Sequence, residues 1–407
     1  MRAGYGRHII TPPLGVELAG FGYYLGRCAL SVRDDLYARA VALEDGDVRA
    51  LILSCDVLGL SKSVCEEVFR HAEGLGIPRE NVLIVSIHTH TGPAVKYHEG
   101  CGYVNDDYVS RLGGKLCKAV DEAVLDLDDV TGMQGVCAPF EGDHIYNRTV
   151  ADGPVDRMIR GFVIERKSGA PLSMVSAACH GVFRGRDTAV SADFAGEINR
   201  LMEEKGYRSI YLNGLCGDID PYMPTGERLE AFARLAVDTF GAGSVTLPLN
   251  MSCTRLPFTL RLTPVTMEDI KGAACEAVKR AGGEDIPAAK VARTWEQEML
   301  EKLDTLEDTE DIACKAVILG GIVVLALPFE GFTRIGQDVR RIIGMPEALV
   351  LGCAEELLGY LPTKDDIDRG AYAALESTFL YKRLPVVPGE AERLGEVMGE
   401  GLKAVLD

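Results

Sequence analysis

An α/β fold, with mixed β-sheets flanked by helices, is predicted for this chain of 407 residues. Strand-like and helix-like segments alternate along its first two thirds. Several apolar strand-like segments end in histidines or carboxylates, an arrangement typical of sites at the edge of an α/β sheet. No internal repeat and no low-complexity linker interrupts the sequence, so we expect a single domain over residues 1–407.

The first predicted elements lie upstream of residue 130. Residues 40–43 and 50–54 are apolar runs on either side of an acidic turn with a glycine, which predicts two strands. Apolar residues at helical spacing predict a helix over residues 61–75, whose first residue is a candidate cap. A β-branched run predicts a strand at residues 82–87, and an amphipathic pattern predicts a long helix at residues 106–127.

The middle of the chain continues the alternation. Residues 162–165 and 172–178 are expected to form a hairpin, because a Ser-Gly pair lies between two apolar runs. Amphipathic spacing predicts a helix at residues 194–205, and the apolar run at residues 209–212 predicts the strand that follows it.

The last third contains a more polar region. Residues 267–280 and 294–303 have helical spacing with runs of charge, which favour a solvated surface. We therefore interpret residues 265–312 as a peripheral helical excursion. The strongly apolar residues 318–327 are expected to form one strand that returns the chain to the core.

Composition narrows the classes of function. The net charge of −18 argues against a nucleic-acid partner and against an anionic membrane surface. No apolar run is long enough to insert into a membrane, and the N-terminus lacks a secretory signal. The 12 cysteines form no CxxC pair and are interpreted as reduced thiols, so we expect a cytoplasmic location. A small-molecule substrate is the expected partner.

The triplet His88-Thr89-His90 is the most informative motif. It follows an apolar, β-branched run and precedes Gly92-Pro93, which predicts a strand end at a sheet edge. Alternation along a strand would place His88 and His90 on one face. Two imidazoles on one face suit a metal ligand with a neighbouring proton carrier. The alternative is a pair of solvated or core histidines beside a turn.

Other polar side chains also follow apolar runs, namely His180, Asp193, Asp218, Asp220, Glu330 and Tyr360. Asp193 precedes a predicted helix and is alternatively a plain helix cap. Asp218 and Asp220 lie in a loop with two glycines. Three alternative roles suit this pair of carboxylates, namely binding a cation, binding ligand amines or capping backbone amides. Their common placement at strand ends favours a shared site.

The histidines divide into two groups. His88, His90 and His180 end buried strands, whereas the remaining four are expected to face solvent, namely His8, His71, His98 and His144. Two imidazoles and one carboxylate leave an open position on zinc for a water, whose pKa the metal lowers to about 7. The residues alone therefore indicate a mononuclear zinc hydrolase.

The motifs, taken together, resemble the catalytic domain of the neutral/alkaline (non-lysosomal) ceramidases, in a short bacterial-type form without the C-terminal β-sandwich domain. The resemblance follows the chain in order through Ile9-Ile10-Thr11-Pro12-Pro13, Gly20-Phe21-Gly22-Tyr23, Leu36-Tyr37-Ala38-Arg39-Ala40, Ser54-Cys55-Asp56, His88-Thr89-His90-Thr91-Gly92-Pro93, Asn147-Arg148, His180, Ser191-Ala192-Asp193, Gly217-Asp218-Ile219-Asp220-Pro221, Pro328-Phe329-Glu330 and Gly359-Tyr360-Leu361-Pro362-Thr363.

The resemblance implies a zinc site with four ligands, His88, His180, Glu330 and Tyr360. It also implies that His90 lies beside the metal and carries protons as general base and then acid. Arg148 would face the substrate carbonyl, and Tyr372 matches a further active-site tyrosine. Asp193 and Asp218 would orient the zinc-binding histidines.

Departures from the family pattern argue against ceramide as the substrate. Asp220 replaces the serine of the family's Gly-Asp-x-Ser-Pro motif and favours a cationic or hydroxyl-rich substrate. Ala94 and Val95 replace two glycines, and Phe329 replaces a third, which is expected to narrow the approach to the metal. We therefore expect cleavage of an amide or related acyl bond in a small polar molecule. The alternatives are a zinc lyase or an esterase-type (phosphoesterase) enzyme acting on a hydroxyl-rich ligand, and a non-catalytic, metal-stabilised binding protein.

Overall fold

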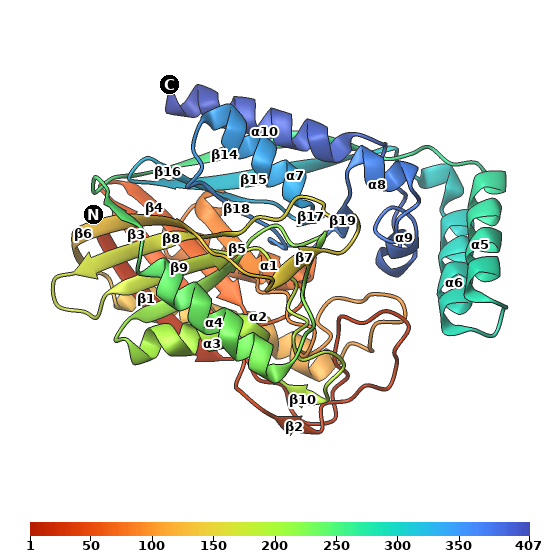
Figure 1. The fold of residues 1–407 in the computed structure, drawn as a ribbon, viewed down its shortest axis with the longest axis horizontal. Coiled ribbons are helices and arrows are strands. Elements are labelled where there is room, and N and C mark those ends of the chain that lie inside the picture. The colour runs from red at the N-terminus through yellow and green to blue at the C-terminus, as the bar shows by residue number, and fades with distance from the viewer.

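Two β-sheets lie face to face between two layers of helices in the computed structural model, which describes residues 1–407 (Figure 1). The larger sheet has the strand order β11-β9-β8-β6-β1-β3-β4-β5, with β13 paired to β6. Its strands are β1 (Arg2–Ile9), β3 (Tyr37–Asp45), β4 (Val48–Cys55), β5 (Val82–Ser86), β6 (Asp128–Pro139), β8 (Met158–Arg166), β9 (Leu172–Ala177), β11 (Arg208–Asn213) and β13 (Ser244–Thr246). The β4–β5 and β9–β11 pairs are parallel and the others antiparallel, which confirms the predicted mixed sheet.

The second sheet has four strands in the order β14-β15-β16-β18. They are β14 (Met251–Arg261), β15 (Thr309–Leu319), β16 (Ile322–Ala326) and β18 (Leu349–Leu351). Three short pairs complete the β-structure, joining β2 (Ser31–Val32) to β10 (Ala189–Val190), β7 (Ile145–Asn147) to β12 (Ile219–Pro221), and β17 (Glu330–Gly331) to β19 (Tyr360–Leu361).

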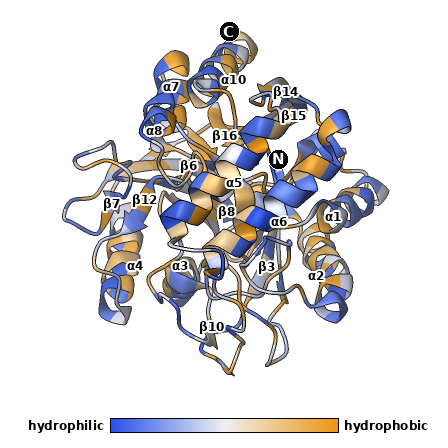
Figure 2. Cartoon of the chain, turned by 90° about the vertical axis from the view of Figure 1, so that its right-hand side faces the viewer, coloured by the Kyte–Doolittle hydropathy of each residue, from blue (hydrophilic) through white to orange (hydrophobic).

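Amphipathic helices cover the outer faces of both sheets, with hydrophilic and hydrophobic residues on opposite sides (Figure 2). The larger sheet is covered by α1 (Lys62–Gly74), α2 (Asp106–Leu125), α3 (Asp193–Glu204) and α4 (Gly226–Phe240), and the second sheet by α7 (Thr333–Ile343) and α10 (Glu390–Leu406). A helical hairpin of α5 (Met267–Ala281) and α6 (Pro287–Glu301) packs against the short helix α9 (Glu376–Tyr381), and the short helix α8 (Lys364–Asp368) contacts α10. Two 3-10 turns occupy Arg79–Asn81 and Leu303–Thr305. No helix combines the length and the apolar character needed to cross a bilayer.

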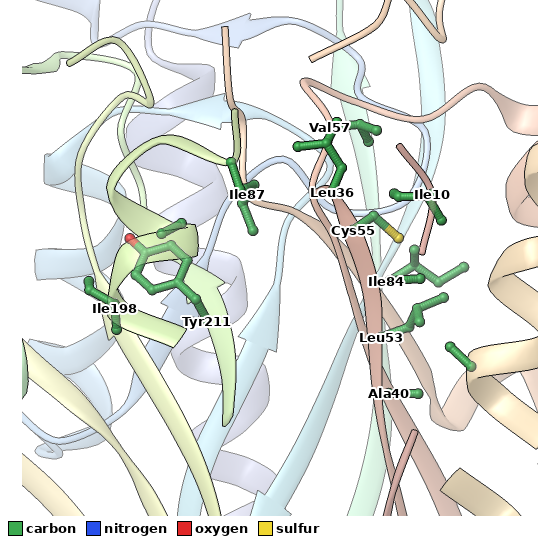
Figure 3. Packing of buried hydrophobic residues seen from close by; sticks show 14 of the residues in the cluster. Ile10, Leu36, Ala40, Leu53, Cys55, Val57, Ile84, Ile87, Ile198 and Tyr211 are labelled. Carbon is green, nitrogen blue, oxygen red and sulfur yellow. The ribbon is translucent and has the colours of Figure 1, made fainter. Parts of the chain in front are cut away.

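Three apolar clusters fill the spaces between these layers. One lies between the larger sheet and its helices and includes Leu53, Ile84 and Ile198 (Figure 3). A second lies between the two sheets, and a third lies between the second sheet and α7 and α10. Because β5 is covered on both faces, its sequence is continuously apolar instead of alternating.

The larger sheet curls so that its two ends meet. Strand β11 at one end packs against β3, β4 and β5 at the other. The Ser54 hydroxyl in β4 donates a 2.6 Å hydrogen bond to the Tyr211 carbonyl in β11. Beyond the strands, Thr89 and Gly181 pair in a parallel bridge. The segments that follow β5 and β9 therefore lie side by side, although five strands separate β5 from β9 in the sheet order.

The predicted elements are largely present with shifted ends. The strand predicted over residues 318–327 is wrong, because Gly320 and Gly321 adopt φ values of 56° and 88° and turn the chain between β15 and β16. The helix predicted from residue 294 begins earlier, with Pro287 in its first turn. Ser61 is the residue before α1, but its side chain forms no capping hydrogen bond. The end of the region 265–312 belongs to β15.

Candidate metal centre and active site

Two buried imidazoles converge on one carboxylate oxygen. Glu330 Oε2 lies 3.1 Å from His88 Nε2 and 3.0 Å from His180 Nε2. All three side chains are at most 2 % exposed. The Nδ1 atoms of His88 and His180 lie 2.8 Å and 2.5 Å from the carbonyl oxygens of Leu58 and Cys216. Since a carbonyl only accepts, both Nδ1 atoms carry hydrogen and act as donors.

This arrangement leaves an unbalanced set of acceptors at the centre. In neutral imidazoles with hydrogen on Nδ1, the Nε2 atoms present lone pairs. Here two such lone pairs face a carboxylate oxygen, so a cation, either a metal ion or protons on the rings, must lie among them. Two imidazole nitrogens and one carboxylate oxygen are donors that Zn²⁺ prefers. The carbonyls behind the rings fix the tautomer and the ring orientation as in metal sites.

Tyr360 supplies a fourth group at the same place. It pairs with Glu330 across the short parallel β17–β19 ladder. Its hydroxyl lies 3.3 Å from His180 Nε2 and accepts a 2.9 Å hydrogen bond from Arg148 Nη2. Burial raises the pKa of Tyr360 well above its usual value, and the Arg148 guanidinium opposes this. Tyr381, which the sequence did not reveal, donates its hydroxyl to Glu330 Oε1.

Cys216 offers an alternative sulfur ligand that the sequence also did not reveal. His88, His180 and Cys216 present one donor atom each within 4.8 Å of one another, and all three are buried. A hydrogen bond from Cys353 lowers the pKa of the Cys216 thiol well below its usual value. His88 and His180 thus form a cluster that could hold a metal ion, with either Glu330 or Cys216 as the third donor. We favour Glu330, because one of its oxygens lies within 3.1 Å of both Nε2 atoms.

His90 lies against this cluster with no partner of its own. Its ring centroid is 5.0 Å from that of His88 and 5.5 Å from that of His180. Neither ring nitrogen of His90 has a hydrogen-bond partner. Burial and the two neighbouring imidazoles keep its pKa well below the usual range, so the ring is neutral. Gly20, at φ 107°, makes room for it, because a Cβ there would lie 2.4 Å from His90 Cγ. A neutral, unpartnered imidazole is suited to accept a proton.

The triplet does not lie on one strand face, as the alternation predicted. Strand β5 ends at Ser86, and His88 adopts φ 62°, in the left-handed region. Strain of this kind in a non-glycine residue is often found at functional sites. The Thr89 and Thr91 hydroxyls hold the turn by donating to the Ser191 carbonyl over 2.7 Å and 3.0 Å. The rings of His88 and His90 meet through this turn instead of through strand alternation.

Arg148 enters the site from the end of β7. It donates from Nη2 over 2.9 Å to the Gly217 carbonyl as well as to Tyr360. Its Nη1 lies 3.5 Å from Asp220 Oδ1, and that oxygen lies 3.8 Å from His180 Nδ1. The charge of Asp220 is therefore compensated by Arg148.

Asp218 and Asp193 have structural partners and no hydrogen bond to a histidine. Asp218 accepts from Asn147 Nδ2 over 2.9 Å and from the Thr333 amide over 2.8 Å, which ties the Arg148 segment to the start of α7. Asp193 accepts from the amides of Arg184 and Phe194. The expected role of orienting the histidines is corrected here, because the carbonyls of Leu58 and Cys216 occupy both Nδ1 atoms.

A small cavity of about 30 Å³ adjoins the cluster. It is lined by Gly20, Gly22, Leu58, His88, His90, His98, Cys101, Glu330, Tyr360, Tyr372, Leu380 and Tyr381. Tyr372 is 40 % exposed, and its ring lies 6.0 Å from that of Tyr360. Ala94, Val95 and Phe329 do not line the cavity and pack in apolar clusters instead, so the expected narrowing by these three residues is wrong.

The prediction that His98 faces solvent is also wrong. Its side chain is buried in the cavity wall, whereas the other three histidines of that group, His8, His71 and His144, are partly exposed. His98 lies in the polar segment Lys96-Tyr97-His98-Glu99, which resembles an exposed loop in sequence. Only His98 of this segment is buried, and the amide of Glu99 holds the segment against α9 by donating a 2.9 Å hydrogen bond to the Leu380 carbonyl.

Comparison with solved structures identifies the fold. No protein-family model and no curated protein matches the sequence. Among solved structures, the neutral ceramidase from Pseudomonas aeruginosa matches with 14 % identity and a TM-score of 0.77, over 100 % of this chain and 74 % of that one. A ceramidase complexed with C2 matches with 13 % identity and a TM-score of 0.74, over 99 % and 75 % of the two chains. The chain therefore has the fold of these ceramidases, which confirms the fold that the motifs predicted.

Proposed function

We propose that the protein is a zinc-dependent hydrolase that cleaves an amide or related acyl bond in a small, polar molecule other than ceramide. The observation that carries this proposal is the convergence of His88 Nε2 and His180 Nε2 on one oxygen of Glu330. The fold shared with two ceramidases supports an acyl amide as the bond that is cleaved. The 12 free cysteines agree with a reducing compartment, so we propose a cytoplasmic location.

Four side chains would hold the zinc ion, namely His88, His180, Glu330 and Tyr360. When bound, zinc supplies Lewis acidity for the acyl carbonyl and for the attacking water. The Leu58 and Cys216 carbonyls keep the two imidazoles in the tautomer that binds a metal through Nε2. Tyr381 holds the carboxylate by donating to its other oxygen, Oε1.

The remaining groups would handle protons and charge. His90 takes the proton of the attacking water on a ring nitrogen and passes it to the departing amine. Both ring nitrogens are unpartnered, so this transfer breaks no hydrogen bond. Arg148 faces the developing oxyanion, and an oxyanion donor contributes about 2.7–4 kcal/mol. Tyr372, at the mouth of the cavity, is a second donor to the same charge.

Two features of the site support a small polar substrate. The cavity beside the cluster is small, with a volume of about 30 Å³, which favours a short acyl group. The ion pair of Arg148 and Asp220, at 3.5 Å, presents both signs of charge next to the cluster. A compensated pair of this kind suits hydroxyl and amide groups better than a lipid tail.

The direct test is amide hydrolysis by zinc-loaded and metal-free protein. The substrates are N-acetylated amines and amino sugars, and the readout is the free amine. We expect release by the zinc-loaded protein, loss after chelation and recovery when zinc returns. Cleavage that persists in the chelated protein would contradict the metal-dependent reaction. If zinc-loaded protein cleaves phosphate esters or eliminates water from polyols and leaves every amide intact, the lyase or esterase-type alternative replaces this proposal.

A further inference from the structure

His98 is a buried polar side chain that the proposed reaction does not use. It is 4 % exposed, and its Nε2 atom has no hydrogen-bond partner. The ring lies in the wall of the cavity, with its centroid 4.4 Å from that of Tyr381. Burial lowers the pKa of His98 to about 3, so the ring is neutral and has one donor and one acceptor nitrogen.

The loop that carries His98 is firmly held. Lys96 Nζ donates to Glu356 Oε1 over 3.1 Å and to the Leu357 carbonyl over 2.6 Å. Lys382 Nζ lies 3.2 Å from the Glu99 carboxylate and 2.8 Å from that of Glu298 in α6. His98 therefore has a fixed position between two anchored neighbours.

An unpaired nitrogen in a fixed, buried position is costly to the protein. A buried polar group without a partner costs about 1–3 kcal/mol. The His98 side chain is only 4 % exposed, so it is shielded from bulk water. A partner that arrives with a ligand in the cavity would remove this cost, which points to a binding role for His98.

The cavity also limits what that ligand group is. Its volume is about 30 Å³. A cavity needs about 10–15 Å³ to hold one water, so this space admits a small group of a few non-hydrogen atoms. Leu380, Tyr372 and Tyr381 line the cavity along with His98, whereas Arg148 and Asp220 do not. A hydroxymethyl group has two non-hydrogen atoms, and its hydroxyl both donates and accepts, as does a neutral imidazole.

We propose that the substrate is a short N-acyl amide whose acyl group carries a hydroxyl, as in a hydroxyacetyl amide, and that His98 hydrogen-bonds this hydroxyl in the cavity. The proposal rests on the proposed function, because it places the acyl carbonyl at the metal cluster. It makes His98 a specificity-determining residue, and it excludes fatty acyl chains.

The test uses hydroxamic acids, which bind zinc through their hydroxamate group and carry an acyl substituent of chosen size. Hydroxyacetohydroxamic, propanohydroxamic and octanohydroxamic acids are titrated by calorimetry into zinc-loaded wild type, His98→Leu and His98→Gln. His71→Leu is the matched control, because His71 lies on α1 and pairs with Asp121 away from the cavity. The first two probes have the same number of non-hydrogen atoms and differ in one hydroxyl.

We expect wild type and His71→Leu to bind the hydroxyacetyl probe roughly tenfold more tightly than the propanoyl probe, the worth of one hydrogen bond. The octanoyl probe should bind at least about a hundredfold more weakly, because overpacking is costly. His98→Leu should lose the preference for the hydroxyl, and His98→Gln should keep part of it.

The experiment distinguishes failure of the His98 proposal from failure of the proposed function. If the probes bind zinc-loaded protein but wild type shows no hydroxyl preference, or His98→Leu retains it, the role of His98 is overturned and the proposed function stands. Tight binding of the octanoyl probe overturns the size limit. If no probe binds zinc-loaded protein, both proposals are overturned. The wild-type comparison of the three probes keeps the test decisive even if His98→Leu fails to fold.

Discussion

Replacing His90 with glutamine separates proton transfer from metal binding. The two ring nitrogens of His90 have no partner, so the substitution removes no existing hydrogen bond. Its ring contacts His88 and His180 at centroid distances of 5.0 Å and 5.5 Å but shares no hydrogen bond with either. His90→Gln should therefore keep its zinc and most of its stability.

The expected effect on the reaction is large. General acid–base catalysis contributes about 10²–10⁴ in rate, so kcat/KM for the cleaved amide should fall by that factor. At about 1.36 kcal/mol per tenfold change, this equals about 2.7–5.4 kcal/mol of transition-state stabilisation. The assay compares His90→Gln with His71→Gln, together with zinc content and thermal unfolding of both. A His90→Gln enzyme within threefold of wild type would refute proton transfer by His90, and loss of zinc with activity would show a structural role.

Three other predictions concern Arg148, Gly20 and Asp193. Arg148→Lys should lower kcat/KM by about 10²–10³ with zinc retained, because lysine cannot reproduce the planar guanidinium donors; unchanged kcat/KM would exclude Arg148 as an oxyanion donor. Gly20→Ala should destabilise the protein by about 1–3 kcal/mol in chemical denaturation, since its Cβ would lie 2.4 Å from His90 Cγ, and unaltered stability would contradict that packing. Burial raises the pKa of Asp193 from 3.8 to about 6. The free energy of unfolding of wild type should therefore fall by about 3 kcal/mol relative to that of Asp193→Asn as the pH rises from below 3.8 through about 6. Denaturant unfolding at several pH values measures this difference, and a difference that does not change with pH would contradict the raised pKa.

The sign of that pH dependence follows from which state holds the proton. The Asp193 carboxyl binds its proton more tightly in the folded protein than in the unfolded chain. Its contribution to stability is therefore fully present below the unfolded pKa and is lost as the pH rises through the folded pKa. The fixed cost of replacing a carboxylate oxygen with an amide at this position does not depend on pH, so the slope is the informative quantity.

The apolar strand patterns predicted the positions at which polar side chains follow buried strands. His88, His180 and Glu330 each follow an apolar run, and the structure brings these three side chains together. These runs stand out in the sequence because β5 and β9 are buried on both faces, so apolar residues predominate in them. The ligand set itself remains a prediction.

Contacts between segments far apart in the sequence depend on long-range packing, which the local sequence pattern does not show. The curl of the larger sheet brings the ends of β5 and β9 together, and no local signal encodes it. Tyr360 meets Glu330 through strands of two residues each, which are too short for periodicity. His98 appears solvent-exposed in sequence because its neighbours are polar. Lys96 is instead satisfied by groups more than 250 residues away.

Metal content tests whether Glu330 completes a zinc site with His88 and His180. Wild type, Glu330→Gln and Cys216→Ser are purified without a metal-binding tag, dialysed against zinc and analysed by elemental mass spectrometry. We expect about one zinc per chain in wild type and in Cys216→Ser, and loss of most of it in Glu330→Gln, because Glu330 lies within 3.1 Å of both Nε2 atoms. Zinc that persists in Glu330→Gln and disappears in Cys216→Ser would assign the third ligand to sulfur. A wild type that binds no metal would contradict the proposed zinc site.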